Sequence, residues 1–110
     1  MEWDLARTAI RGLRTGTNLD TSRSNYRFYI GNTEKGVKVK IGRTAQIEIP
    51  DEVLKLCFHS LSMPQGYNTR FFQRQFPNLY QTHGCHVHVI GQLFVKAGLA
   101  SQSEKGYFLT

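Results

Sequence analysis

The hydrophobic pattern of this chain changes period twice, and that change limits the folds open to it. Between residues 26 and 49 apolar residues recur at every second position, as in "VKVKI" at 37–41. A period of two is typical of strands with one buried and one solvent-facing side. Two turn-forming segments, "NTEKG" and "GRT", divide this region into three runs. The pattern predicts a three-stranded antiparallel meander with one wet face.

The first of these runs, "YRFYI", carries an alternation that assigns its two faces. We expect Tyr26, Phe28 and Ile30 to share the buried face, with Arg27 and Tyr29 on the face toward solvent. In the second run the lysines occupy the solvent-facing positions. The wet face of the meander is therefore expected to be basic.

The rest of the chain has helical spacing of its apolar residues. Helices are expected at residues 2–14, 51–61, 68–76 and 85–97. Gly98 is expected to cap the last of them, and a turn at 104–106 should join two short closing strands. Segment 78–84, "NLYQTHG", is expected to be a loop. The chain of 110 residues is thus predicted to be one α+β domain, residues 1–110.

The charge balance favours an anionic partner. There are 14 Lys and Arg residues against 8 Asp and Glu residues, which gives a formal net charge of +6. A small domain with this balance is attracted to polyanions, most often nucleic acid. The sequence also contains no apolar run of about 20 residues that could span a membrane.

The chain opens without the apolar segment of a secretory signal, so we expect reduced cysteines and a cytoplasmic, nucleoid-associated protein, or a nuclear one in a eukaryote. Cys57 lies in the apolar stripe of the helix at 51–61 and should be a small buried hydrophobic residue.

Over residues 45–110 the order of elements resembles winged helix-turn-helix DNA-binding domains. The likeness is carried by the helix at 51–61, the short helix at 68–76, and "CHVHVIGQLFVKAGLA" followed by the turn into "GYFLT". It implies a wing-like hairpin and a recognition helix at about 85–97 that reads the major groove of duplex DNA. Residues 1–44 would be an added helix and a basic hairpin. The segment from Pro77 to Cys85 is longer than the turn of a tight helix-turn-helix.

Three residues are predicted to contact bases. His88 and Gln92 lie one turn apart on the polar side of the proposed recognition helix, and His83 precedes its N-terminus. Gln pairs well with adenine, and His can donate to the acceptors of guanine. Gly91 between them should leave the backbone open to a close approach.

Donor side chains elsewhere are predicted to hold phosphates. Those before the recognition helix, those on the basic strands and those on the wing are all of the types that contact the DNA backbone. The predicted phosphate contacts are Arg23, Arg27, Lys38, Lys40, Arg43, Thr69, Arg70, Arg74, Thr82, Lys96, Gln102 and Lys105.

The cluster "HGCHVH" offers metal-type ligands, but a helical wheel separates them. Cys85 and His88 share a face at a spacing of three, whereas His86 points toward the core. A zinc site would need His83 and a distant residue such as His59 as well. We therefore predict no metal and no cofactor, and we expect His86 to be a hydrogen-bonded core histidine.

No catalytic motif is present, and "PDEVLK" lacks the second acid-x-Lys element of a nuclease, so no enzyme is predicted. The favoured function is duplex DNA binding, as a transcriptional regulator or as the DNA-reading part of a restriction or mobile-element system. Two alternatives stay open: a protein-interaction module that uses exposed apolar residues such as Val95, and a small metal-dependent enzyme that uses the His/Cys cluster. A palindromic target would favour a homodimer, and a larger protein partner is the other option.

Overall fold

The computed structural model describes residues 2–21 and 26–110, which form an α+β fold with five helices and two small antiparallel sheets. The predicted contact Arg23 lies outside the described residues. The helices are α1 (Trp3–Arg11), α2 (Asp51–Ser60), α3 (Thr69–Gln75), α4 (Pro77–Thr82) and α5 (His86–Lys96). The strands are β1 (Arg27–Asn32), β2 (Gly36–Ile41), β3 (Gln46–Pro50), β4 (Ala100–Ser103) and β5 (Gly106–Leu109). None of the helices in the described part is long and apolar enough to cross a membrane.

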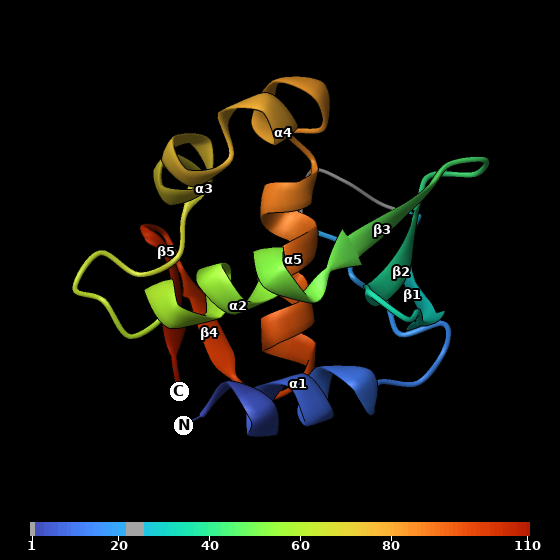
Figure 1. Ribbon diagram of the computed structural model, residues 1–110, viewed down its shortest axis with the longest axis horizontal. Coiled ribbons are helices and arrows are strands. Elements are labelled where there is room, and N and C mark those ends of the chain that lie inside the picture. Colours follow the sequence, from blue (N-terminus) through green and yellow to red (C-terminus); the bar gives the residue numbers. More distant parts are fainter. Residues whose placement is uncertain (1, 22–25) are drawn as a thin grey trace.

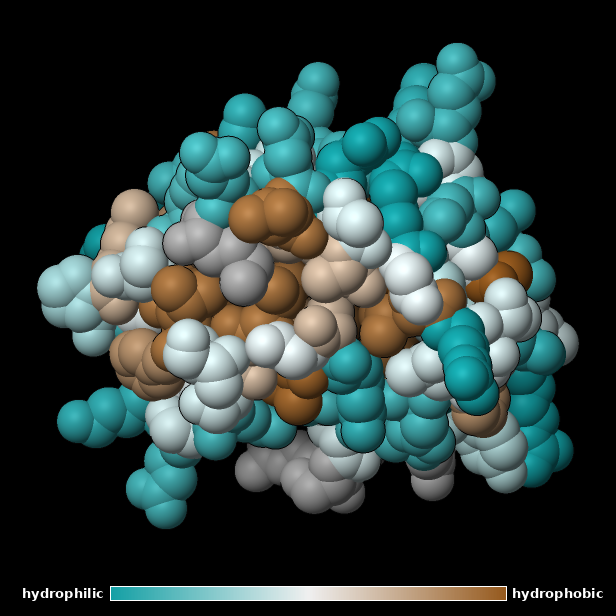
Figure 2. Space-filling view, turned by 90° about the horizontal axis from the view of Figure 1, so that it is seen from below, coloured by the Kyte–Doolittle hydropathy of each residue, from teal (hydrophilic) through white to brown (hydrophobic). Residues whose placement is uncertain are grey.

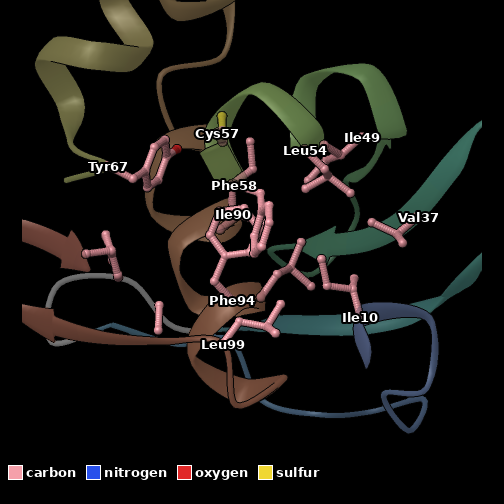
Figure 3. Packing of buried hydrophobic residues seen from close by; sticks show 14 of the residues in the cluster. Ile10, Val37, Ile49, Leu54, Cys57, Phe58, Tyr67, Ile90, Phe94 and Leu99 are labelled. Carbon is pink, nitrogen blue, oxygen red and sulfur yellow. The ribbon is translucent and has the colours of Figure 1, made fainter. Parts of the chain in front are cut away.

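Helix α5 runs through the middle of the molecule, between the three-stranded sheet and the β4–β5 hairpin (Figure 1). Its side chains from Val89 to Phe94 are buried, including those on what was expected to be the polar side. Figure 3 shows Ile90 and Phe94 of α5 beside Phe58 of α2. The rings of Phe58 and Phe94 meet edge to face, with centroids 6.2 Å apart. The last long helix of the chain is therefore the centre of the core.

The three-stranded sheet has the predicted order, β1-β2-β3, but the face assignment of β1 was wrong. Tyr29 is only 1% exposed and lies opposite Val39, whereas Tyr26 is exposed. A register shift between Tyr29 and Gly31 interrupts the simple alternation. The hydroxyl of Tyr29 is also hydrogen-bonded to Asn32 Oδ1, which satisfies the polar end of a ring that the core can then accept.

Two helix boundaries also differ from the prediction. Helix α1 ends before Gly12 rather than at residue 14, and segment 78–84, expected to be a loop, lies largely in α4. Pro77 does end α3, but it also begins α4. The first position of a helix suits proline, since the missing N–H has no partner there and the fixed φ is already helical. The helix that begins at Pro77 was therefore not predicted from the sequence.

The hairpin β4–β5 is held to α5 by Tyr107. The ring of Tyr107 lies directly on Gly91: a Cβ atom placed on Gly91 would be 2.3 Å from Cζ of the ring. Tyr107 also pairs with Tyr67 through two backbone hydrogen bonds of 2.8 Å, and the Tyr67 hydroxyl donates to the carbonyl of Val87 at 2.7 Å. These contacts join the hairpin, the segment before α3, and α5 into one unit.

Helix α1 is held by a carboxylate far away in the sequence. Asp51 accepts hydrogen bonds from Arg7 at 2.8 Å and from Arg11 at 3.2 Å. Arg11 also donates to the carbonyl of Thr33 at 3.2 Å. Pro50, not Asp51, is the N-cap residue of α2, and Asp51 is the first residue of that helix. Its carboxylate serves instead to join α1 to the start of α2.

We expect Gly91→Ala to lower the free energy of unfolding by about 1–3 kcal/mol, because the added methyl group overlaps the Tyr107 ring. Alanine would otherwise favour the helix by about 1 kcal/mol over glycine. Denaturant unfolding measures the change. In a Tyr107→Leu background, Gly91→Ala should leave the free energy of unfolding nearly unchanged or raise it. If Gly91→Ala destabilises equally in both backgrounds, the ring contact is not the cause.

We expect Asp51→Asn to cost about 1–2 kcal/mol of stability, since it removes a charged acceptor shared by two arginines. Denaturant unfolding at low and high salt measures this loss. Glu52→Gln is the matched control, because Glu52 is an exposed acid in the same first helical turn. An equal loss in the two variants would point to the helix dipole rather than the ion pairs.

Candidate nucleic-acid interface

Four residues predicted to contact DNA line a single hollow in the structure. Thr69 comes from the start of α3, His88 from α5, and Gln102 and Lys105 from the β4–β5 hairpin. The hollow has a volume of about 150 Å³, and we refer to it as the hairpin hollow. The sequence separates these residues by up to 36 positions, from 69 to 105, and the packing of Tyr107 on α5 brings them together.

The polar wall of the hairpin hollow centres on His88 and Tyr107. His88 Nδ1 lies 3.2 Å from the Tyr107 hydroxyl, within hydrogen-bond distance. Burial raises the pKa of Tyr107 above its usual value, while a hydrogen bond with Gln92 and the charge of Arg27 act in the opposite direction. The phenol is therefore neutral at physiological pH and fixes the ring of His88 at the edge of the hollow.

Gln92 was predicted to read a base, and the structure contradicts its exposure. The residue is 6% exposed, and its Nε2 donates to Oε1 of Gln102 at 3.0 Å. The expected open backbone at Gly91 is likewise closed by the Tyr107 ring. Gln92 and Gly91 are covered for the same physical reason. The hairpin packs on the face of α5 that would be exposed if the helix were isolated. Gln92 instead orients Gln102, which is exposed on β4.

The hairpin hollow continues into two further depressions along α3. One, of about 310 Å³, shares Asn68 and Lys105 with the hairpin hollow. The next, of about 380 Å³, shares Asn68 and Arg70 with that depression and extends to Arg74. We refer to this largest one as the α3 hollow. Asn68 lines all three, and its side chain caps α3 by accepting from Phe71 N at 2.8 Å.

Arg27 is a predicted phosphate contact on the sheet that does not line the hairpin hollow. Its charge acts on Tyr107, and its Nη1 atom is buried without a hydrogen-bond partner. Lys38 lies opposite Glu48, and Lys40 is half-buried. Arg43 lies over the ring of Tyr26, 4.9 Å from its centroid, and donates to its hydroxyl at 2.9 Å. The sheet itself lies on the other side of α5 from the hairpin (Figure 1).

The remaining predicted contacts lie around α5 but outside the hollow. Thr82 donates to the carbonyl of Asn78 at 3.0 Å, so its hydroxyl already has an acceptor in α4. His83 is exposed just before α5, and Lys96 is exposed at its other end. Lys96 is two turns along the helix from His88, about 12 Å at 1.5 Å per residue. These three residues do not line the hairpin hollow.

Of the His/Cys cluster, His86 points into the core as the helical wheel predicted, and its ring lies 5.3 Å from that of His83 between centroids. His86 is 3% exposed, and its Nδ1 lies 3.0 Å from the carbonyl oxygen of His83, which confirms a hydrogen-bonded core histidine. Cys57 is buried and free, as expected, and burial raises the pKa of its thiol to about 12. Within 2–21 and 26–110, no three His, Cys, Asp or Glu side chains gather closely enough to hold a metal ion.

Sequence reasoning missed two features of the site. Tyr107 was placed in the closing strand without a role, although it positions the hairpin and touches His88. The loop residues Met63 to Gly66 were assigned no role, although they line the α3 hollow. The signal for the first was the aromatic pair Tyr107 and Phe108 after Gly106 in a short and mostly polar hairpin. Nothing in the local sequence pattern indicated the second.

Comparison of the chain with known protein families, with curated proteins and with solved structures finds no match. The hollows and the charges around them are therefore the basis on which a function is proposed.

We expect His86 to titrate below 6.5, its usual pKa, because burial disfavours the charged ring more than the hydrogen bond to His83 favours it. The ring is then neutral at pH 7. As the pH falls below 6.5 the unfolded chain takes up this proton first, so stability falls with decreasing pH. The NMR shift of the ring protons against pH measures the midpoint. A midpoint at or above 6.5 would contradict this environment.

Proposed function

We propose that this protein binds double-stranded DNA through the surface formed by the hairpin hollow and the basic side chains of α3. The observation that carries the proposal is the convergence of Thr69, His88, Gln102 and Lys105 on one hollow. Lys105 and Thr69 supply donors for phosphates, and His88 and Gln102 supply polar tips that can reach base edges. Arg70 lines the adjoining depression and extends the cationic surface.

The charge distribution supports this proposal. Among the residues that the structure describes, Asp51 is the only carboxylate in an ion pair, and its partners are Arg7 and Arg11 on α1. The cations beside the hollows therefore have no described carboxylate within ion-pair distance. Glu104 is the one acid that lines any of the three hollows. Uncompensated cations around a concave polar surface attract phosphates and release counterions.

The arrangement of elements also supports a winged-helix-like reading. Helix α2, the residue Tyr67, α3, α5 and the β4–β5 hairpin follow one another in the order of that fold, and Tyr67 pairs with the second hairpin strand. Under this winged-helix-like reading, α4 (Pro77–Thr82) is an insertion before α5. The proposed contact differs from that of an open recognition helix, because α5 is buried and contributes His88 alone to the hollow. The hairpin therefore carries most of the proposed DNA contact.

We expect Lys105→Ala to weaken binding to every duplex alike and to reduce the salt dependence of the affinity by about one counterion. Fluorescence anisotropy with labelled duplexes over a range of salt concentrations measures both quantities. Lys55→Ala is the matched control, because Lys55 is exposed on α2 and lines none of the three hollows. If the two variants bind DNA equally well, the hairpin hollow is not the interface.

His88 and Gln102 should determine sequence preference, since both are polar side chains that line the hollow. Selection of duplexes from a random pool by the native protein and by a His88→Ala/Gln102→Ala variant should show a preference that the variant loses. An unchanged preference would remove these residues from base recognition.

A second candidate function is protein binding through α1. Figure 2 shows apolar side chains gathered on the face seen from below, where α1 lies. Leu5 of α1 is 62% exposed, more than any other exposed large apolar side chain in the described part of the chain. Val95, expected to be exposed for such a role, is half-buried. Complete absence of DNA binding at low salt would favour this second function.

A further inference from the structure

We propose that the α3 hollow binds one unpaired nucleotide, either as a free nucleoside phosphate or as part of a single-stranded segment. The α3 hollow adjoins the hairpin hollow and shares the arginines of α3 with the proposed duplex surface, but its apolar side chains do not belong to that surface. Its volume of about 380 Å³ falls within the range of roughly 300–1,000 Å³ that pockets for small organic molecules occupy. The ligand class follows from what lines it.

The base-binding part of the α3 hollow is apolar. Met63 and Pro64 form one wall, and Phe71 of α3 forms another. The ring of Phe71 is held by an edge-to-face contact with Tyr67, at 6.1 Å between centroids, and it is only partly buried. Met63 is 51% exposed, although it is a large apolar side chain. Apolar and aromatic surfaces of this kind receive the face of a nucleobase regardless of which base it is.

The phosphate-binding part consists of two guanidinium groups. Arg70 and Arg74 lie one helical turn apart on α3, and both are exposed and line the hollow. No acidic side chain lines this hollow, and neither arginine is ion-paired to a described carboxylate. Guanidinium groups bind phosphate through paired N–H donors, so two of them at the rim favour a phosphate-bearing ligand over a neutral one.

Amide side chains complete the lining. Gln65 and Gln75 are both exposed at the hollow, and each offers a donor and an acceptor. Asn68 contributes less, because its side chain already accepts a hydrogen bond from Phe71 N and donates one to the carbonyl of Gln65. An apolar wall, two cations and two exposed amides together match the base, the phosphate and the polar base edge of a nucleotide.

NMR titration of the labelled protein tests this proposal. Nucleoside monophosphate, the nucleoside without phosphate, and inorganic phosphate are added in separate experiments, while the backbone signals of Gly66, Phe71 and Arg74 are followed. The monophosphate should bind at least about tenfold more tightly than either fragment. Equal binding by inorganic phosphate, or no binding by any nucleotide ligand, would overturn the proposal.

A short single-stranded oligonucleotide distinguishes the two sources. If the oligonucleotide binds at the same signals and the monophosphate does not, the occupant is a nucleotide within a strand. If the monophosphate binds as tightly as the oligonucleotide, the occupant is a free nucleotide. Absence of both responses contradicts the site.

Variants separate this site from the duplex surface. Arg74→Ala should weaken nucleotide binding about tenfold, and Met63→Glu should abolish it, because it puts a carboxylate beside the base and the phosphate. Lys105→Ala should leave nucleotide binding unchanged, because Lys105 does not line the α3 hollow. If the native protein binds no nucleotide, and Met63→Glu still binds duplex DNA, only this further proposal fails. If nucleotide binding is present without duplex binding, only the proposed function fails.

Discussion

The arrangement of the second half of the chain depends on the contact between the Tyr107 ring and Gly91. The ring can lie on α5 only because position 91 has no side chain, and this contact brings the hairpin against the helix. Tyr107 then pairs with Tyr67, whose hydroxyl reaches α5 through the carbonyl of Val87. One aromatic residue thus connects three segments. The hairpin hollow exists because these segments converge there.

The same contact places α5 in the core and leaves the hairpin and α3 at the surface. Because the hairpin and the sheet cover α5 on two sides, that helix supplies stability and contributes few groups to solvent. Donor side chains gather instead on the hairpin and on α3, around three adjoining depressions. The one ion-paired carboxylate in the described chain, Asp51, holds α1. The cations near the hollows therefore keep their charge available for an anionic ligand.

Most elements could be read from the sequence, because helix and strand periods depend on local spacing. The sheet order, α2, α3, α5 and the closing hairpin were all predicted. The errors fell where a neighbour overrides the local pattern. Tyr29 is buried because a register shift and the contact with Asn32 accommodate it. Gln92 is buried because the hairpin covers it and Gln102 accepts its hydrogen bond. Both are polar-tipped residues whose orientation depends on a partner elsewhere.

By itself, the sequence determined the α+β class, the basic charge and the inward position of His86, because composition and helical spacing are sufficient for these. Only the tertiary structure decided which donors share a surface. Thr69, His88 and Lys105 belong to separate elements, and their proximity follows from how those elements pack. The same holds for Met63 and Arg74 at the α3 hollow. Period and charge are local properties, whereas a concave site is built from contacts between distant residues.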